Sequence, residues 1–140
     1  MKYINEKNLI SKEIFLKKDE SGNWECLTKG EFEKEDDQEG FEKETVEFVR
    51  PSWALAAHVD RLSSDVNVVG VRTTLIDAAI ESTVKFYWKK SSFLELELEK
   101  NELGFENISE DQWEKLVGED GLSPKVVIGI YRSYREISDI

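Results

Sequence analysis

The spacing of the apolar residues changes along this chain, and the change falls near Pro51. Before it, apolar and polar residues alternate in short segments such as Thr45–Val49, which is the two-residue period of a strand. After it, apolar residues recur every three or four positions, which is the period of a helix that buries one face. We therefore predict an α+β fold in which a small N-terminal β-hairpin or sheet precedes a mainly α-helical bundle.

The length of 140 residues predicts a single domain, β-rich over residues 1–50 and mainly helical over residues 51–140. In the first part, Glu13–Lys17 and Trp24–Thr28 flank a turn at Asp19–Asn23, so we expect a hairpin. Thr45–Val49 is the third expected strand. Because a chain of this length can bury a sufficient core, it needs neither disulfides nor a structural metal.

An acidic segment, residues 30–44, separates the hairpin from the third strand. It holds eight carboxylates and two lysines. Such a charge run is typical of a mobile, solvated loop. The alternative is an electrostatic lure for a basic partner, for which Asp36 and Asp37 are candidate contacts.

The second half predicts four helices. Pro51 suits a first helical position, and the helix that it opens should reach about Leu62, where Ser63–Asp65 breaks it. A longer helix is expected over residues 68–90. Residues 93–99 alternate strictly and are left open between strand, helix and linker. The expected largely buried residues are Trp53, Leu75, Ile76, Ile80, Phe86, Val127 and Ile130.

Two helix starts near the C-terminus are the clearest local signals. Ser109 and Gln112 match a capping box, in which the hydroxyl and the amide satisfy each other's backbone N–H groups, and this helix should stop at Gly118. Ser123 and Pro124 predict the start of a last helix that runs to about residue 136.

The formal net charge of −11 argues against binding to nucleic acid or to anionic membranes, because both are negatively charged. No apolar run reaches the roughly 20 residues of a membrane span. The N-terminal residues lack a signal-peptide pattern. Cys26 is the only cysteine, so no intrachain disulfide is expected. These features together predict a cytoplasmic protein.

The sequence contains no recognisable catalytic motif. His58 is the only histidine, and no cysteine or serine in a nucleophile motif accompanies it. The carboxylates lack the spacing of an EF-hand. We therefore expect no enzyme activity, no metal site and no cofactor, and we expect the chain to act by binding another protein. Amphipathic aromatic residues concentrate at such contact surfaces, so one or two of the four tryptophans are candidates.

Three segments give the chain a resemblance to a known family. Residues 48–53 (FVRPSW) open the helical region, residues 75–80 (LIDAAI) lead toward Trp88, and residues 122–127 (LSPKVV) lead to residues 131–136 (YRSYRE). This order resembles the tail assembly chaperones of long-tailed bacteriophages. The resemblance implies a non-enzymatic helper, made in the host cell cytoplasm, that coats the tape-measure protein and recruits tail-tube subunits. Its implied partner face consists of Trp53, Trp88, Tyr131 and Tyr134.

Two other roles stay open. An acidic nucleic-acid mimic would inhibit a host defence or DNA-binding protein, and its binding would weaken with salt. A structural tail-completion subunit would self-associate into a homo-oligomer.

Overall fold

Within the residues that the computed structural model describes (9–69, 78–118 and 123–138), four antiparallel strands form the main sheet. Their order is β2-β1-β3-β4, and a separate two-stranded sheet pairs β5 with β6. The strands are β1 (Leu9–Lys18), β2 (Trp24–Thr28), β3 (Glu42–Val49), β4 (Trp88–Ser91), β5 (Leu98–Lys100) and β6 (Glu106–Ile108).

The predicted hairpin is confirmed. β1 pairs with β2 from Ile14 opposite Thr28 to Lys18 opposite Trp24. In the turn, the Asp19 side chain accepts hydrogen bonds from the backbone N–H groups of Ser21 and Asn23. Gly22 has a φ of 86°, a conformation in which glycine has no steric penalty. The predicted third strand is also present as β3, and it pairs with the other edge of β1.

The acidic segment is more ordered than a solvated loop. It begins with a short helix, α1 (Lys29–Glu33), whose capping box joins Thr28 and Glu31. The ring of Phe32 stacks on Phe15 of β1 with centroids 3.9 Å apart, and Phe41 meets Phe32 edge-on. Phe32 and Phe41 are the apolar residues of this charged run, and their packing holds its two ends against the sheet.

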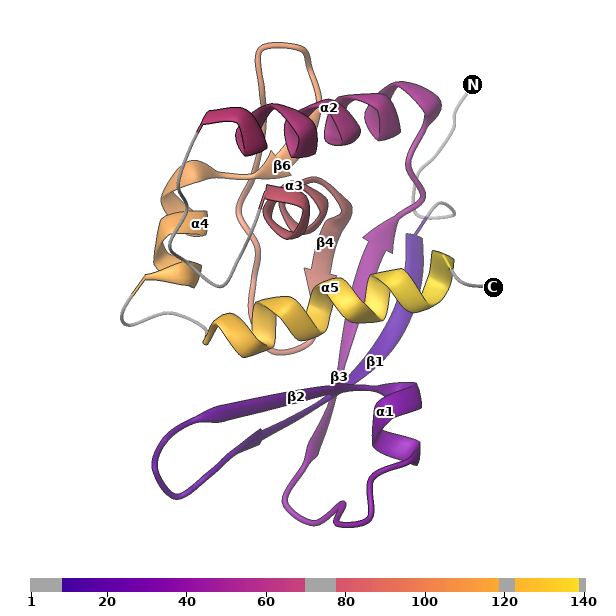
Figure 1. Ribbon diagram of the computed structural model, residues 1–140, viewed down its shortest axis with the longest axis vertical. Helices are drawn as coiled ribbons and strands as arrows, with labels where there is room; N and C mark the ends of the chain where they lie inside the picture. The colour runs from indigo at the N-terminus through magenta and orange to yellow at the C-terminus, as the bar shows by residue number, and fades with distance from the viewer. Residues whose placement is uncertain (1–8, 70–77, 119–122, 139–140) are drawn as a thin grey trace.

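Four longer helices follow in the described part of the chain, and three of them pack beside one another. They are α2 (Trp53–Val69), α3 (Ala78–Tyr87), α4 (Glu110–Val117) and α5 (Pro124–Ser138). Figure 1 shows α3 viewed along its axis between α2 and α5, while α1 lies at the far end of the molecule. Segments from both halves of the chain share one core, whose fully buried members include Trp88, Phe48, Ile14, Ile108 and Ile130.

The predicted mainly helical bundle is wrong. The helices pack on an antiparallel sheet, and the second half of the chain supplies its fourth strand. The helix expected to continue to residue 90 ends at Tyr87, and the chain enters β4 directly. β4 pairs with β3, with Phe48 opposite Trp88, because this register buries both aromatic side chains in the core.

The predicted start at Pro51 and the predicted end near Leu62 of the preceding helix are also wrong. α2 begins at Trp53, because the Ser52 hydroxyl caps it by accepting a hydrogen bond from the Leu55 N–H. The helix continues through Ser63, whose hydroxyl donates to the Val59 carbonyl and is thus satisfied inside the helix. Residues 70–77, which include the expected core residues Leu75 and Ile76, lie outside the described part.

Both C-terminal helix starts are confirmed, with one change in detail. Ser109 caps α4 by accepting from the Gln112 N–H, and Ser123 accepts from the Lys125 N–H at the start of α5. The Gln112 amide does not return the bond to Ser109. It binds the backbone of Glu95 and Glu97 instead. Residues 95–97 are therefore held beside α4 without forming a strand, whereas Leu98 and Glu99 belong to β5.

Burial follows the prediction for Phe86, Val127 and Ile130, whereas Ile80 is half-buried. Trp53 is the exception, because it is exposed. No described helix combines the length and the apolar character that crossing a bilayer requires.

Candidate functional site

An open groove of about 560 Å³ lies where α2, α3 and α5 meet. We call it the aromatic groove, because four of its lining residues are aromatic: Trp53, Tyr87, Tyr131 and Tyr134. Three alanines add small side chains: Ala56, Ala57 and Ala79. Asp60 and Arg135 are its charged members. The groove thus joins three of the four residues of the predicted partner face, taken from helices that are far apart in the sequence.

Trp53 is 92% exposed, so its predicted burial is wrong. The reason is its phase on α2. The row of α2 that faces the core contains Leu55, Val59 and Leu62. Trp53 is two residues before Leu55, which turns it roughly 200° away from that row. Trp53 therefore buries almost none of its surface in the fold, and its ring is available to contact a partner.

Tyr134 and Tyr87 form the packed part of the groove. Their ring centroids are 5.0 Å apart, and Phe48 holds the Tyr134 ring edge-on at 5.3 Å. Burial raises the pKa of Tyr87 to about 12, with smaller contributions from Tyr134 and Asp60. Burial also raises the pKa of Tyr134, which Arg135 partly offsets. Both phenols therefore keep their protons at neutral pH and can donate hydrogen bonds.

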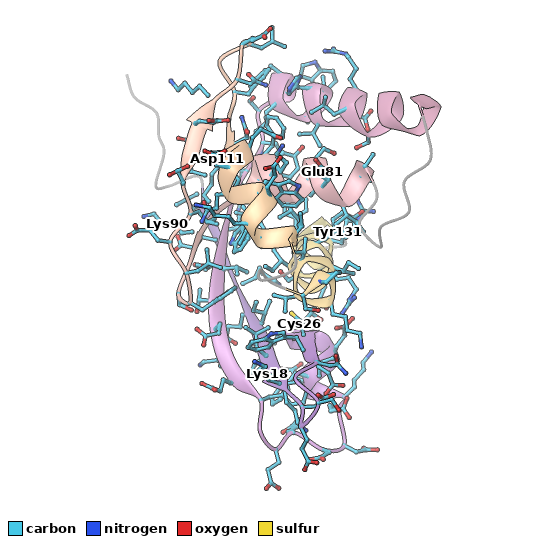
Figure 2. The ribbon with its side chains drawn as sticks, turned by 90° about the vertical axis from the view of Figure 1, so that its left-hand side faces the viewer. Lys18, Cys26, Glu81, Lys90, Asp111 and Tyr131 are labelled. Atoms are coloured by element: carbon cyan, nitrogen blue, oxygen red, sulfur yellow. The ribbon has the colours of Figure 1, made fainter. Side chains whose placement is uncertain are left out.

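The opposite side of α5 is closed against the sheet. In Figure 2, which views α5 end-on, Tyr131 and Cys26 lie on opposite sides of the helix. A Cβ on Gly129 would be only 2.3 Å from the Cys26 Sγ, so glycine is required at this crossing. Burial raises the pKa of the Cys26 thiol to about 12, which leaves it protonated and unreactive.

Polar contacts fasten the same closed side. Arg132 donates to both carboxylate oxygens of Glu31, at 2.9 and 3.2 Å, and to the Cys26 carbonyl at 3.1 Å. The Thr28 hydroxyl donates to Glu136. These contacts tie α1 and β2 to α5, so the side of α5 that carries Tyr131 and Tyr134 has a fixed position.

The prediction that Trp88 is the fourth residue of the partner face is wrong, because the side chain is buried. It is 0% exposed in β4, and its indole N–H donates to the Lys90 carbonyl at 3.0 Å. It stabilises the core and offers a partner no surface. The sequence did not reveal this, because Trp88 lies at a helix-to-strand junction that no local period marks.

Asp36 and Asp37 are exposed, but they lie far from the aromatic groove. They follow α1 in the connection to β3, at the end of the molecule opposite α2 (Figure 1). Asp37 accepts a hydrogen bond from the Glu39 N–H at 3.1 Å. The structure therefore separates the acidic candidates from the aromatic ones.

A second cavity, of about 330 Å³, is lined by His58 and Leu62 of α2 together with residues of α3 and of the β5–β6 region. The Asn101 side-chain oxygen accepts from the N–H groups of Leu103 and Phe105, so its nitrogen must face His58 Nε2, at 3.1 Å. Nε2 is therefore the acceptor, and the proton of the neutral ring is on Nδ1. That atom is buried without a partner among the described residues. Burial, with a contribution from Arg61, lowers the pKa of His58.

Aromatic rings make the main contacts of the His58 side chain among the described residues. His58 stacks on Phe105 and meets Phe86 edge-on, and no nucleophile is placed against it by the hydrogen bonds of the described residues. Across the same residues, no three His, Cys, Asp or Glu side chains are grouped to hold a metal ion.

Sequence reasoning missed several groove residues that a spacing rule could have found. Ala56, Ala57 and Asp60 follow Trp53 at three, four and seven positions, which places them on one face of α2. Thr83 and Tyr87 follow Ala79 at intervals of four on α3 in the same way. The sequence shows that these residues share a face of their helix, but it does not show which helices pack against one another.

Comparisons with known proteins add no relative: no protein-family model, no curated protein and no solved structure matches this chain.

Proposed function

We propose that this protein is a non-enzymatic protein-binding factor and that the aromatic groove is its partner site. The exposed Trp53 beside Tyr131 and Tyr134 carries the proposal. Tryptophan and tyrosine dominate the energetics of protein interfaces, because they bury a large area at low cost in side-chain entropy. The rigid attachment of α5 to the sheet supports the same role, since a preformed site loses little entropy on binding.

The role that we propose is assembly of a bacteriophage tail in the host cytoplasm, as the resemblance to tail assembly chaperones implies. A long tape-measure protein would be the client, and a tail-tube subunit would be the second partner. Several clients of an assembly factor can share one aromatic surface, because apolar contacts tolerate varied sequences. The net charge of −11 would keep such a complex soluble.

A pull-down of the tagged chain tests this proposal. The chain is expressed with its neighbouring genes, the complex is washed at low and at high salt, and the retained proteins are identified by mass spectrometry. We expect a tape-measure or tail-tube protein that survives high salt. Trp53→Ala should abolish its capture, whereas Leu103→Ala should not. Leu103 is a matched control, because it is the other large exposed apolar residue of the described chain, at 65%, and lies in the β5–β6 turn.

The ordered acidic segment supports a second candidate, an inhibitor that mimics nucleic acid. The contacts of Phe32 and Phe41 hold the backbone of this segment near the sheet at its two ends. In the same pull-down, this candidate predicts a basic host protein that is lost as salt rises, because screening weakens exposed charge contacts. Its capture would depend on Asp36 and Asp37 and would be unaffected by Trp53→Ala. That outcome would replace our first proposal.

A further inference from the structure

The hydrogen-bonding character of the aromatic groove indicates what kind of backbone it accepts. Its donors are the phenol hydroxyls of three tyrosines, the indole N–H of Trp53 and the Arg135 guanidinium. None of the phenol or indole groups has a hydrogen-bond partner among the described residues, and none is counted among the buried unpaired atoms. They are therefore free to donate to an occupant. Asp60 is the one carboxylate among the described lining residues.

An α-helical occupant would not use these donors. A helix satisfies its own carbonyl groups internally, apart from those of its last turn. A polyproline II segment has no internal hydrogen bonds, so its carbonyl oxygens are exposed acceptors, and proline contributes no N–H that would need an acceptor. The free phenol and indole donors of the groove complement these exposed carbonyl oxygens.

The shape of the groove supports the same occupant. Proline rings pack against flat aromatic faces, which is how aromatic-lined grooves bind proline-rich segments in other domains. Trp53 and Tyr131 offer partly or wholly exposed rings on opposite walls, α2 and α5. Ala56, Ala57 and Ala79 keep the space between the helices open. The partial negative charge of exposed carbonyls also complements the Arg135 guanidinium.

We propose that the aromatic groove binds an extended, proline-rich segment of the partner in the polyproline II conformation. This inference rests on the proposed protein-binding role and specifies its ligand. The phenol hydroxyls of Tyr131 and Tyr134 and the Trp53 indole N–H donate to carbonyl oxygens of the segment. The rings of Trp53 and Tyr131 contact its prolines.

Binding of synthetic peptides to the full chain tests the ligand class. The probes are a decaproline peptide, an amphipathic helical peptide of equal length and a glycine-serine peptide. Titrations are followed by calorimetry and by the tryptophan indole ¹H–¹⁵N resonances, among which the Trp53 signal is identified by its loss in Trp53→Ala. We expect decaproline to bind, to shift the Trp53 signal and to bind at least about ten-fold more tightly than the other peptides.

Variants separate ring contacts from hydrogen bonds. Trp53→Ala should weaken decaproline binding about ten-fold or more, and Tyr131→Phe, which removes only a hydroxyl, about three- to ten-fold. Leu103→Ala should bind as the wild type does. Unchanged thermal unfolding of each variant shows that the fold is intact.

Two results would overturn this inference: tighter binding of the helical peptide than of decaproline, or decaproline binding that survives Trp53→Ala. If the pull-down of the tail proteins still depends on Trp53, only the ligand class has failed and the protein-binding role stands. If neither the pull-down nor peptide binding depends on Trp53, the proposed function fails as well.

Discussion

The two sides of α5 differ in what their residues contact. The side toward the sheet carries Val126, Ile130 and Ser133, all fully buried, and Gly129, which crosses Cys26 too closely for a side chain. The other side carries Tyr131, Tyr134 and Arg135, which line an open groove. One fifteen-residue helix thus belongs to the core and to the candidate site at once.

Residues on one side of α5 should therefore determine stability, and residues on the other side should determine binding. On the closed side, each atom has a packed neighbour, so substitutions there should lower the free energy of unfolding. On the open side, Tyr131 is only partly buried and the phenol hydroxyls have no hydrogen-bond partner among the described residues. Removing these hydroxyls should change binding and leave the fold intact. The predictions below test that division.

The largest effect should come from two tryptophans with opposite burial. Trp88→Ala should lower the free energy of unfolding by about 3–5 kcal/mol, because it empties the centre of the core. Trp53→Ala should change it by less than about 0.5 kcal/mol, because Trp53 is 92% exposed. Urea unfolding followed by circular dichroism measures both values. Similar losses in the two variants would contradict the assignment of Trp88 to the core and of Trp53 to the exposed groove.

A smaller loss is expected at the crossing of α5 and β2. Gly129→Ala should cost about 1–3 kcal/mol, because the added Cβ would be 2.3 Å from the Cys26 Sγ and one element must shift. Lys125→Ala, at an exposed position of the same helix, is the control and should stay within about 0.5 kcal/mol of the wild type. Since alanine favours helices over glycine, a Gly129→Ala variant that is more stable than the wild type would contradict the close crossing.

The smallest effect should be a pH dependence from His58, which lines the second cavity. Burial, with Arg61, lowers its pKa below the ordinary value of 6.5, so the unfolded chain takes up the proton first as pH falls. The stability contributed by neutral His58 is complete above pH 6.5 and is lost as pH falls through the folded-state pKa. Protonation also places a second N–H against the Asn101 amide nitrogen.

Two measurements check this dependence. Because His58 is the only histidine, NMR follows its ring signals directly from pH 8 to pH 5. Urea unfolding at pH 7 and pH 5.5 should show a larger loss of stability for the wild type than for His58→Gln. A titration midpoint at or above 6.5, or equal losses in both proteins, would rule out the proposed burial effect.

Sequence alone determined the elements whose signals are local. The turn at Asp19–Asn23 and the alternating segments beside it predicted the hairpin, because turn chemistry and the two-residue period act within a few residues. Ser109 and Ser123 predicted two helix starts, because a capping hydroxyl needs only backbone N–H groups two or three positions away. The family resemblance also named three of the four aromatic residues of the proposed site, but it missed Tyr87 and included the buried Trp88.

Only the tertiary structure decided the rest, because the deciding contacts join distant segments. Helix α3 ends at Tyr87 and β4 begins at Trp88 because β3, forty residues earlier in the chain, offers an edge on which Trp88 is buried opposite Phe48. Trp53 is exposed because Leu55 and Val59 fix which face of α2 meets the core. The aromatic groove exists because α2, α3 and α5 pack so that its lining residues face a common space. Periodicity shows which residues share a face of a helix, but only packing decides what that face meets.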